Sequence, residues 1–371
     1  MHRSAPSTLT RALRRAGVVL VSCLAVATLA SCGGGTQSKK FEPQSFVVFG
    51  DELSLITSDG LAGVSANEGA TYGAASFVSG SSGPYDCVDH YSWIMLAADA
   101  LGFKFSNECA AWLSDAVNLK TAVMLANDPG DVDVTNDTSV DLAVTNAGVD
   151  AILAKINANL DKVDGQTLVS VNAGRADIVK AYRQFLAAPS NLEVIRLALK
   201  AKGQAFAEGL RPLVNKGARV LLVLSPGLSE SPLVKSSPSG DLVRNKAAML
   251  ALGKAFNEGA ELRAGAIYTG QQLGLIRLDQ AVEAMVSNVQ VFGTTSNSFG
   301  LVNIDAAGCA SPATTAPLCL DSALTAAPTS GNADGSDNTY LWSDATHVSN
   351  GFYIRQTFAN LVLARIANQP F

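Results

Sequence analysis

The chain has 371 residues, of which 48% are hydrophobic, 16% charged and 6% aromatic, and its formal net charge is −5 at pH 7. This composition excludes an intrinsically disordered chain, because disordered chains are rich in charge and poor in apolar residues. A collagen-like or coiled-coil rod is also excluded, since neither a Gly-X-Y period nor sustained heptads is present. We expect no nucleic-acid partner, because the acidic chain shows no basic face.

The first 31 residues have the pattern of an export signal. An apolar run over 17–30 follows a basic segment without acids, whose basic residues are Arg3, Arg11, Arg14 and Arg15. The run is shorter than the roughly 20 residues that span a bilayer. It ends in LASC (29–32), which resembles the lipobox of bacterial lipoproteins. The alternative is an ordinary cleaved signal followed by a chance cysteine.

The lipobox resemblance implies cleavage before Cys32 and acylation of that cysteine, which would make the membrane a partner through a lipid anchor. Gly33 in place of Asp implies, by the same resemblance, the outer membrane rather than the inner one. Such an anchor is stable, because each buried methylene contributes about 0.8 kcal/mol. We therefore predict a lipoprotein signal peptide at 1–31, the lipidated cysteine and linker at 32–44, and a single domain at 45–371.

The remaining cysteines agree with export. Beyond Cys23 in the signal and Cys32, they are Cys87, Cys109, Cys309 and Cys319. An even number in an oxidising compartment indicates two disulfides. Three pairings are possible, and we expect the nearest neighbours in the sequence to pair. No CxxC or His-x₃-His spacing is present, so we expect no metal site.

Apolar strands and amphipathic helices alternate along the body of the chain. Strands are expected at 45–50, 167–171, 219–224 and 273–278; helices at 88–101, 149–160, 178–186, 192–214, 245–262 and 351–367; loops at 54–84, 127–140 and 302–339. The strands are continuous apolar runs, which predicts a mostly parallel sheet with helices on both faces. Sites in such sheets lie at the carboxyl ends of the strands.

Two segments far apart in the sequence carry the candidate chemistry. They read FGDELS (49–54), directly after the first strand, and YLWSDATHVS (340–349), before the last helix. Together they resemble the SGNH or GDSL-type esterase and lipase family, which has Gly-Asp-Ser-Leu and Asp-x-x-His at these places. The resemblance covers most of the chain after the signal. It implies a flavodoxin-like, three-layer α/β/α sandwich.

The family mechanism implies a role for each matching position. In the family, the Ser attacks an ester carbonyl, the His takes its proton, and the Asp holds the His ring. Asp344 and His347 match, but Glu52 stands at the nucleophile position. A Gly and the Asn of Gly-x-Asn-Asp supply oxyanion donors in the family. Their positions here hold Asn146 and, within AGRAD (173–177), Ala176.

Other residues near these motifs are cleft candidates: Asp51, Ser54, Gly174 and Arg175. Arg175 would bind a carboxylate or phosphate as a planar fork, or else be a solvated loop residue. The family resemblance implies a supporting role for Asp177. If the fold is kept, Glu52 would face His347, and we hypothesise an ion pair that raises the pKa of His347.

These substitutions favour one function over another. We expect an envelope lipoprotein of the family that is a degenerate ester hydrolase and binds a lipid, glycan or protein ligand in the old cleft. The alternative is an active esterase or lipase, in which Glu52 or Ser54 is the nucleophile and works with His347 and Asp344. A third possibility is a purely structural envelope lipoprotein. No cofactor is expected in any of them.

Overall fold

The computed structural model of the chain describes residues 41–54, 56–57, 70–71, 92–105, 120–124, 148–308, 339–349 and 351–368. The chain divides into a unit of Met1–Phe41 with Pro370 and a unit that contains Glu42–Gln369. Several residues named above lie outside the described residues: Cys32, Cys87, Cys109, Cys309, Cys319 and Asn146. The export signal, the lipid anchor and the disulfides therefore stay predictions.

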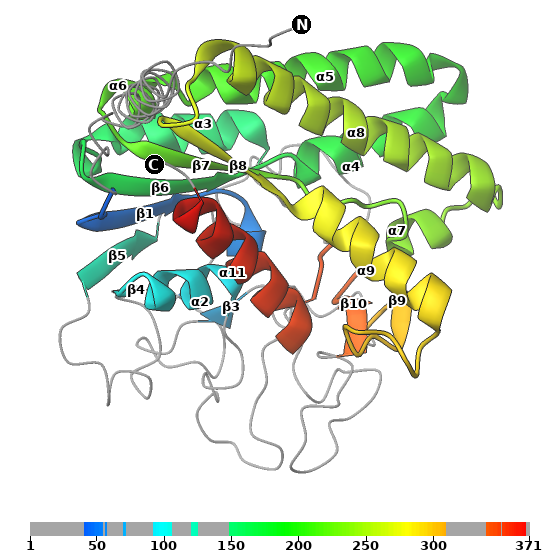
Figure 1. Ribbon diagram of the computed structural model, residues 1–371. Coiled ribbons are helices and arrows are strands. Elements are labelled where there is room, and N and C mark those ends of the chain that lie inside the picture. The colour runs from blue at the N-terminus through cyan, green and yellow to red at the C-terminus, as the bar shows by residue number, and fades with distance from the viewer. Residues whose placement is uncertain are drawn as a thin grey trace, which may run out of the picture. The chain divides into compact units, whose positions relative to one another are not determined.

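A six-stranded sheet forms the centre of the second unit (Figure 1). Its spatial order is β4 (Phe103–Phe105), β5 (Lys120–Met124), β1 (Ser45–Phe49), β6 (Thr167–Asn172), β7 (Arg219–Leu224) and β8 (Leu273–Arg277). All neighbouring strands in this sheet are parallel. Without the edge strand β4, the order is 2-1-3-4-5 in chain order, which is the flavodoxin-like arrangement. The predicted α/β fold with a mostly parallel sheet is confirmed.

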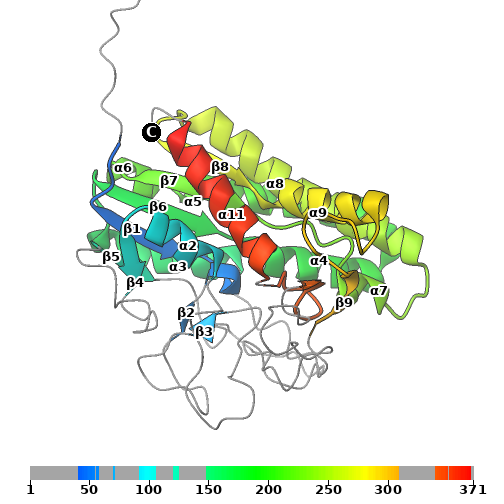
Figure 2. The same ribbon diagram turned by 60° about the horizontal axis from the view of Figure 1, so that its bottom comes forward.

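Helices cover both faces of the sheet (Figures 1 and 2). One layer contains α2 (Trp93–Ala100), α9 (Leu278–Phe292) and α11 (Phe352–Ala367), and the other contains α3 (Val149–Ala158), α4 (Arg175–Ala187), α5 (Leu192–Gly209), α6 (Arg211–Asn215) and α8 (Leu242–Ile267). This double cover explains why β6 and β7 are apolar runs buried along nearly their whole length. Among the described residues, no helix is both long enough and apolar enough to cross a membrane.

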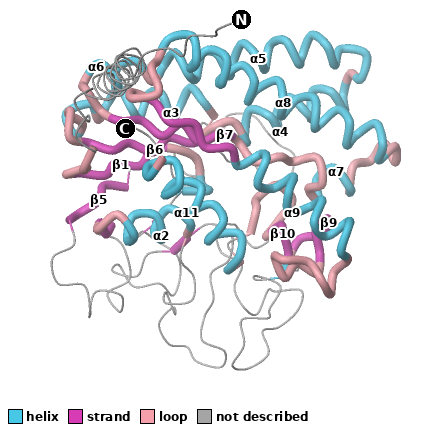
Figure 3. The backbone as a smooth tube through the Cα atoms, viewed as in Figure 1, coloured by secondary structure: helices cyan, strands magenta, loops and turns pink. Residues whose placement is uncertain are grey.

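Shorter elements complete the fold (Figure 3). They are β2 (Ile56–Thr57), β3 (Ala70–Thr71), β9 (Asn303–Ala307), β10 (Tyr340–Trp342), α7 (Pro232–Lys235) and the 3₁₀ turns η1 (Glu52–Ser54), η5 (Leu160–Lys162) and η6 (Pro189–Asn191). The strands β9 and β10 pair with each other, as do β2 and β3. The prediction of continuous loops at 54–84 and 302–339 is therefore wrong where these short strands lie.

The predicted helix over 192–214 is also wrong in one detail. The chain forms two helices, α5 and α6, which meet at Leu210. Pro212 lies in the first turn of α6 and has no backbone N–H to donate to the carbonyl of Glu208. The helix therefore ends, and Pro212 becomes the second residue of α6, in the first turn, where a backbone N–H has no partner within the helix.

Candidate functional site

The candidate site lies at the carboxyl end of the sheet, between β1 and β6. These strands are neighbours, but the chain runs from β1 to β5 on one side and continues through β6 to β8 on the other. Ligands of doubly wound sheets bind at such a switch point. Asp51 and Ser54 follow β1, and Asn172 and Arg175 lie at or just after the end of β6. The topology brings the first motif to this place.

A buried hydrogen-bond network ties the loop after β1 to the end of β6. The Ser54 hydroxyl donates to Asn172 Oδ1 at 2.6 Å, and Asn172 Nδ2 donates to Asp51 Oδ1. The backbone N–H of Leu53 also donates to Asp51 Oδ1, at 3.1 Å. Ser54, Asp51 and Asn172 are all at most 3% exposed. The network therefore satisfies three buried polar side chains at once.

Gly50 makes this network possible. Its φ of +151° lies in a region that L side chains rarely adopt, and a Cβ there would lie 1.8 Å from Asn172 Oδ1. The chain can therefore turn from β1 towards Asp51 only because no side chain stands between it and Asn172. From the other side, Trp93 Nε1 of α2 donates to the Leu53 carbonyl at 2.8 Å and fixes the loop.

The second motif forms a tight loop after β10. Asp344 Oδ1 accepts the backbone N–H groups of Thr346 and His347, both at 2.8 Å. Asp344 Oδ2 lies 2.6 Å from His347 Nδ1. The Ser343 N–H donates to the His347 carbonyl at 2.9 Å and closes the loop. One carboxylate thus shapes the backbone and orients the imidazole ring.

Arg175 joins the two halves of the site. Its Nη1 donates to Thr346 Oγ1 at 2.9 Å, and the side chain is only 1% exposed. Gly174 precedes it with φ +114°, where a Cβ would lie 2.2 Å from Phe256 Cε1. This glycine turns the chain directly from β6 into α4, so the first residue of the helix reaches the His347 loop. The alternative prediction, that Arg175 is a solvated loop residue, is therefore wrong.

The surrounding charges control the protonation of the dyad. Burial and the cation of Arg175 lower the pKa of His347, and they outweigh Asp344 and Asp51, which raise it. Burial alone would raise the pKa of Asp344, but His347 and the two backbone N–H groups lower it to about 2. At neutral pH the dyad therefore holds an ionised carboxylate and a neutral imidazole. With Nδ1 donating to Asp344, Nε2 is the ring atom that can accept a proton.

The expected ion pair of Glu52 and His347 does not agree with this direction, because the pKa of His347 is lowered and not raised. The causes are the burial of the imidazole and, after it, the buried guanidinium of Arg175, which the sequence did not place beside the ring. Glu52 begins η1 at the nucleophile position, and its side chain lies outside the described residues.

Of the two positions that match the family's oxyanion donors, the structure describes Ala176 and does not describe Asn146. Ala176 is the second residue of α4 and offers only a methyl group, 8% exposed. Asp177, next to it, accepts the Val149 N–H at 2.9 Å and caps α3. Burial raises the pKa of Asp177. Its contact with α3 agrees with the expected supporting role.

Two residues of the site were missed by the sequence reading, Asn172 and Thr346. The available signal for Asn172 was a polar amide that ends an apolar strand directly before the AGRAD segment. Thr346 lies inside the Asp-x-x-His motif, but its partner Arg175 is 171 residues away in the sequence. In the described part of the chain, no three His, Cys, Asp or Glu side chains gather as a metal site would require.

No family model matches the chain, and no curated protein sequence matches it. Among the solved structures that resemble it are two enzymes from Streptomyces. An extracellular lipase from Streptomyces rimosus is 15% identical, with coverage of 66% of this chain and 82% of that chain and a TM-score of 0.34. A phospholipase A1 from Streptomyces albidoflavus NA297 is 14% identical, with coverage of 87% and 98% and a TM-score of 0.38.

Likeness at this level of identity and TM-score carries no argument about this chain. The chain's own geometry defines its class. It is an α/β protein with a flavodoxin-like sheet and a hydrolase-like Asp–His dyad beside the switch point.

Proposed function

We propose that this protein is an exported lipoprotein of the SGNH/GDSL hydrolase family that binds a ligand in the former catalytic cleft and does not hydrolyse esters. One observation carries the proposal. The dyad that would accept a proton is formed, while the Ser54 hydroxyl, in the loop where the nucleophile belongs, donates to Asn172 Oδ1 at 2.6 Å. A hydroxyl that donates to an amide oxygen is not activated by a base.

Two substitutions support the same conclusion. Glu52 has no hydroxyl to attack an ester, and loss of a triad nucleophile leaves only a small remainder of the catalysis. Ala176 offers no side-chain donor to an oxyanion. Loss of one such donor costs roughly 3–4 kcal/mol of transition-state stabilisation in comparable sites. The ligand would be a lipid, a glycan or a protein segment, with a small ester as the simplest mimic.

The second candidate is an active esterase that uses Ser54 or Glu52. The lowered pKa of His347 favours it, because a neutral imidazole held by Asp344 is the form that serves as a general base. For Ser54 to act, its hydroxyl would have to leave Asn172 and turn to His347 Nε2. For Glu52, the carboxylate would attack the ester carbonyl and break its C–O bond, and the expelled alkoxide would take a proton from water and leave as the alcohol. A second water would then cleave the anhydride, which releases the acid and restores the Glu52 carboxylate.

Hydrolysis of p-nitrophenyl butyrate separates the two candidates. We expect the wild-type protein and the His347→Ala variant to release p-nitrophenol at the same rate. Wild-type turnover that collapses in His347→Ala would overturn the proposal. Loss of that turnover in Ser54→Ala or in Glu52→Gln would then identify the nucleophile. Glu52→Ser tests whether the dyad can be used again, and we expect a gain in rate over the wild type.

Lipidation is tested separately by metabolic labelling with a radioactive fatty acid in a bacterial host. The proposal expects label on the wild-type protein and none on Cys32→Ser. Equal labelling of the two proteins would contradict lipidation of Cys32, and the hydrolysis experiment would not be affected.

A further inference from the structure

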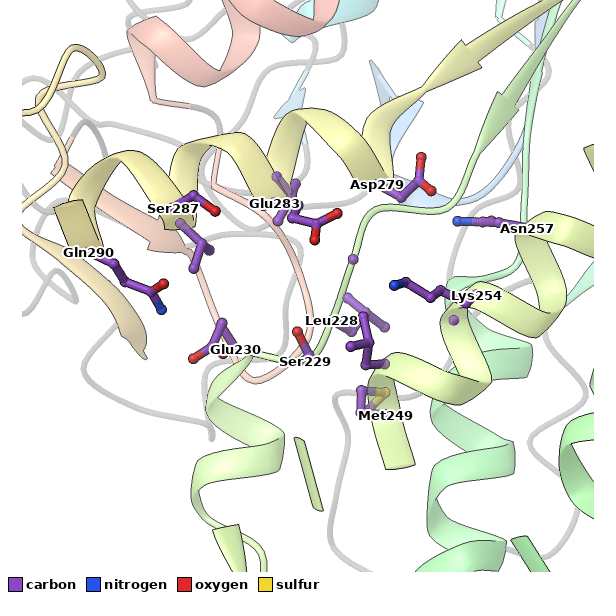
Figure 4. Close-up of a pocket in the computed structure, with 15 residues that line it drawn as sticks. Leu228, Ser229, Glu230, Met249, Lys254, Asn257, Asp279, Glu283, Ser287 and Gln290 are labelled. Atoms are coloured by element: carbon purple, nitrogen blue, oxygen red, sulfur yellow. The ribbon is translucent and has the colours of Figure 1, made fainter. Parts of the chain in front are cut away.

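A pocket of about 240 Å³ lies beyond the ends of β7 and β8, between α8 and α9 (Figure 4). It shares no residue with the Asp344–His347 site. Its walls are Met249, Gly253 and Asn257 along one face of α8, Val282 and Val286 along α9, and the segment 227–230 after β7. Its volume is somewhat below the roughly 300–1,000 Å³ of typical drug-sized ligand sites, so it suits a small molecule.

The pocket has an apolar body. Leu228, Met249, Val282 and Val286 line it, and each is at most 8% exposed. Val282 and Val286 lie one turn apart on α9, Met249 lies on α8 and Leu228 on the segment after β7, so three segments together form the apolar wall. Such a wall fits an aliphatic group of a ligand.

Two opposite charges face the same space. Figure 4 shows Lys254 of α8 and Glu283 of α9 pointing into the gap between the helices. Among the described residues neither side chain has an ion-pair partner within 4 Å. The other acids of the wall are already neutralised, because Asp279 binds Arg277 and Glu230 binds Lys246. What remains is one cation and one anion.

A buried acceptor lies at the strand end of the pocket. Asn257 is 3% exposed, and its Nδ2 donates to the Ser225 carbonyl at 3.0 Å. Its Oδ1 is buried and has no hydrogen-bond partner within the described structure. Buried acceptors of this kind are rare in native proteins.

From these features we propose that the α8–α9 pocket binds a small zwitterion with an apolar side chain, such as a free aliphatic amino acid. The ligand's ammonium contacts Glu283, its carboxylate contacts Lys254, and its side chain packs on Met249 and Val286. The apolar wall alone would suit any hydrophobic group. The unpaired charges select a molecule that carries both signs.

Calorimetric titration of the full-length protein with L-leucine tests the proposal. L-leucine amide lacks the carboxylate and N-acetyl-L-leucine lacks the ammonium, so each should bind at least tenfold more weakly. Lys254→Met should weaken the binding of L-leucine at least tenfold and leave the affinity for L-leucine amide unchanged. Glu283→Gln should weaken the binding of L-leucine at least tenfold and leave the affinity for N-acetyl-L-leucine unchanged. Lys216→Met, which lies outside the pocket, is the charge control.

A matched pair of glycine variants in α8 tests the place of binding. A Cβ at Gly253 or at Gly265 meets nothing within 4 Å, but only Gly253 lines the pocket. Leucine at either position improves helix propensity, so both variants should fold. Gly253→Leu should abolish L-leucine binding, and Gly265→Leu should bind as the wild type does.

Three results would overturn the proposal: no heat of binding with L-leucine at millimolar concentration, equal binding of L-leucine and its two analogues, or unchanged binding in Gly253→Leu. None of them bears on ester hydrolysis, because the pocket and the dyad share no residue. Failure here is therefore distinguishable from failure of the proposed function.

Discussion

The loop after β1 and the loop after β10 meet at the same buried edge of the sheet, but they are held in different ways. In the second loop, Asp344 binds Nδ1 of His347, which leaves Nε2 as the ring atom that can accept a proton. In the first, Ser54, Asp51 and Asn172 bind one another and direct no described hydroxyl towards that base. Under the proposed function, the first loop is a structural tie, and only the second has the arrangement that a base requires.

The largest effect is expected from Gly50→Ala. The new Cβ would strain the backbone at φ +151° and collide with Asn172 Oδ1. We expect a loss of roughly 2–6 kcal/mol in the free energy of unfolding, measured by denaturant titration. Gly102→Ala is the control, since its φ of +80° is also positive but a Cβ there meets nothing within 4 Å. It should lose only about 1–2 kcal/mol, and equal losses would mean that the contact with Asn172 is unimportant.

Asn172→Ala removes the residue that joins Asp51 to Ser54. Both partners are buried and would lose a hydrogen bond. Because each unsatisfied buried group costs about 1–3 kcal/mol, we expect a loss of roughly 2–4 kcal/mol in unfolding free energy. Asn215→Ala, at an exposed position, should stay within about 0.5 kcal/mol of the wild type. If Asn172→Ala gained esterase activity without loss of stability, the network would be a brake on Ser54 and not a structural tie.

The His347 loop makes stability depend on pH. The pKa of His347 is lower in the folded protein than its ordinary value of 6.5, so the unfolded chain binds more protons below pH 6.5. Stability should therefore fall from pH 6.5 downwards until the folded-state pKa is passed. Asp344 adds a second loss between its ordinary pKa of 3.8 and its folded value of about 2.

Unfolding titrations of the wild type and His347→Gln between pH 7 and pH 5 measure the first of these losses. The variant should be less sensitive to pH over this range. A wild type that gains stability as the pH falls from 7 to 5, relative to the variant, would contradict the lowered pKa.

The smallest effect is a change of pKa without a change of fold. Arg175→Met removes the cation beside His347, so the pKa of His347 should rise. Asp51→Asn removes an anion and should lower it further. NMR titration of the imidazole measures both. A His347 pKa that stays the same in Arg175→Met would mean that burial and the two carboxylates set it without Arg175.

Much of the fold could be predicted, because its signals are local. The apolar run over β7 predicts that strand exactly, and the helical spacing of α3 and α11 places both helices to within two residues. The strands β4 and β5 were missed because neither is a continuous apolar run: β4 is only FKF, and β5 begins with Lys120 and Thr121. The helix α9 was missed although Leu278, Val282, Met285, Val286 and Val289 follow helical spacing and are buried.

The site was predictable only in part, because motifs reveal residue types and not partners. The Asp344–His347 pair is local, and its spacing of three residues gives the contact directly. The contacts of Ser54 with Asn172 and of Arg175 with Thr346 join residues 118 and 171 positions apart. Only the sheet topology brings these segments together, so the lowered pKa of His347 could not be read from the sequence.

The central claim is that the loop after β1 holds no activated nucleophile, and covalent trapping tests it most directly. The intact protein is incubated with a fluorophosphonate, which phosphonylates activated serines, and its mass is then measured. The account predicts no adduct on the wild type and an adduct at residue 52 in Glu52→Ser, as a positive control. A stoichiometric adduct that maps to Ser54 and disappears in His347→Ala would contradict it.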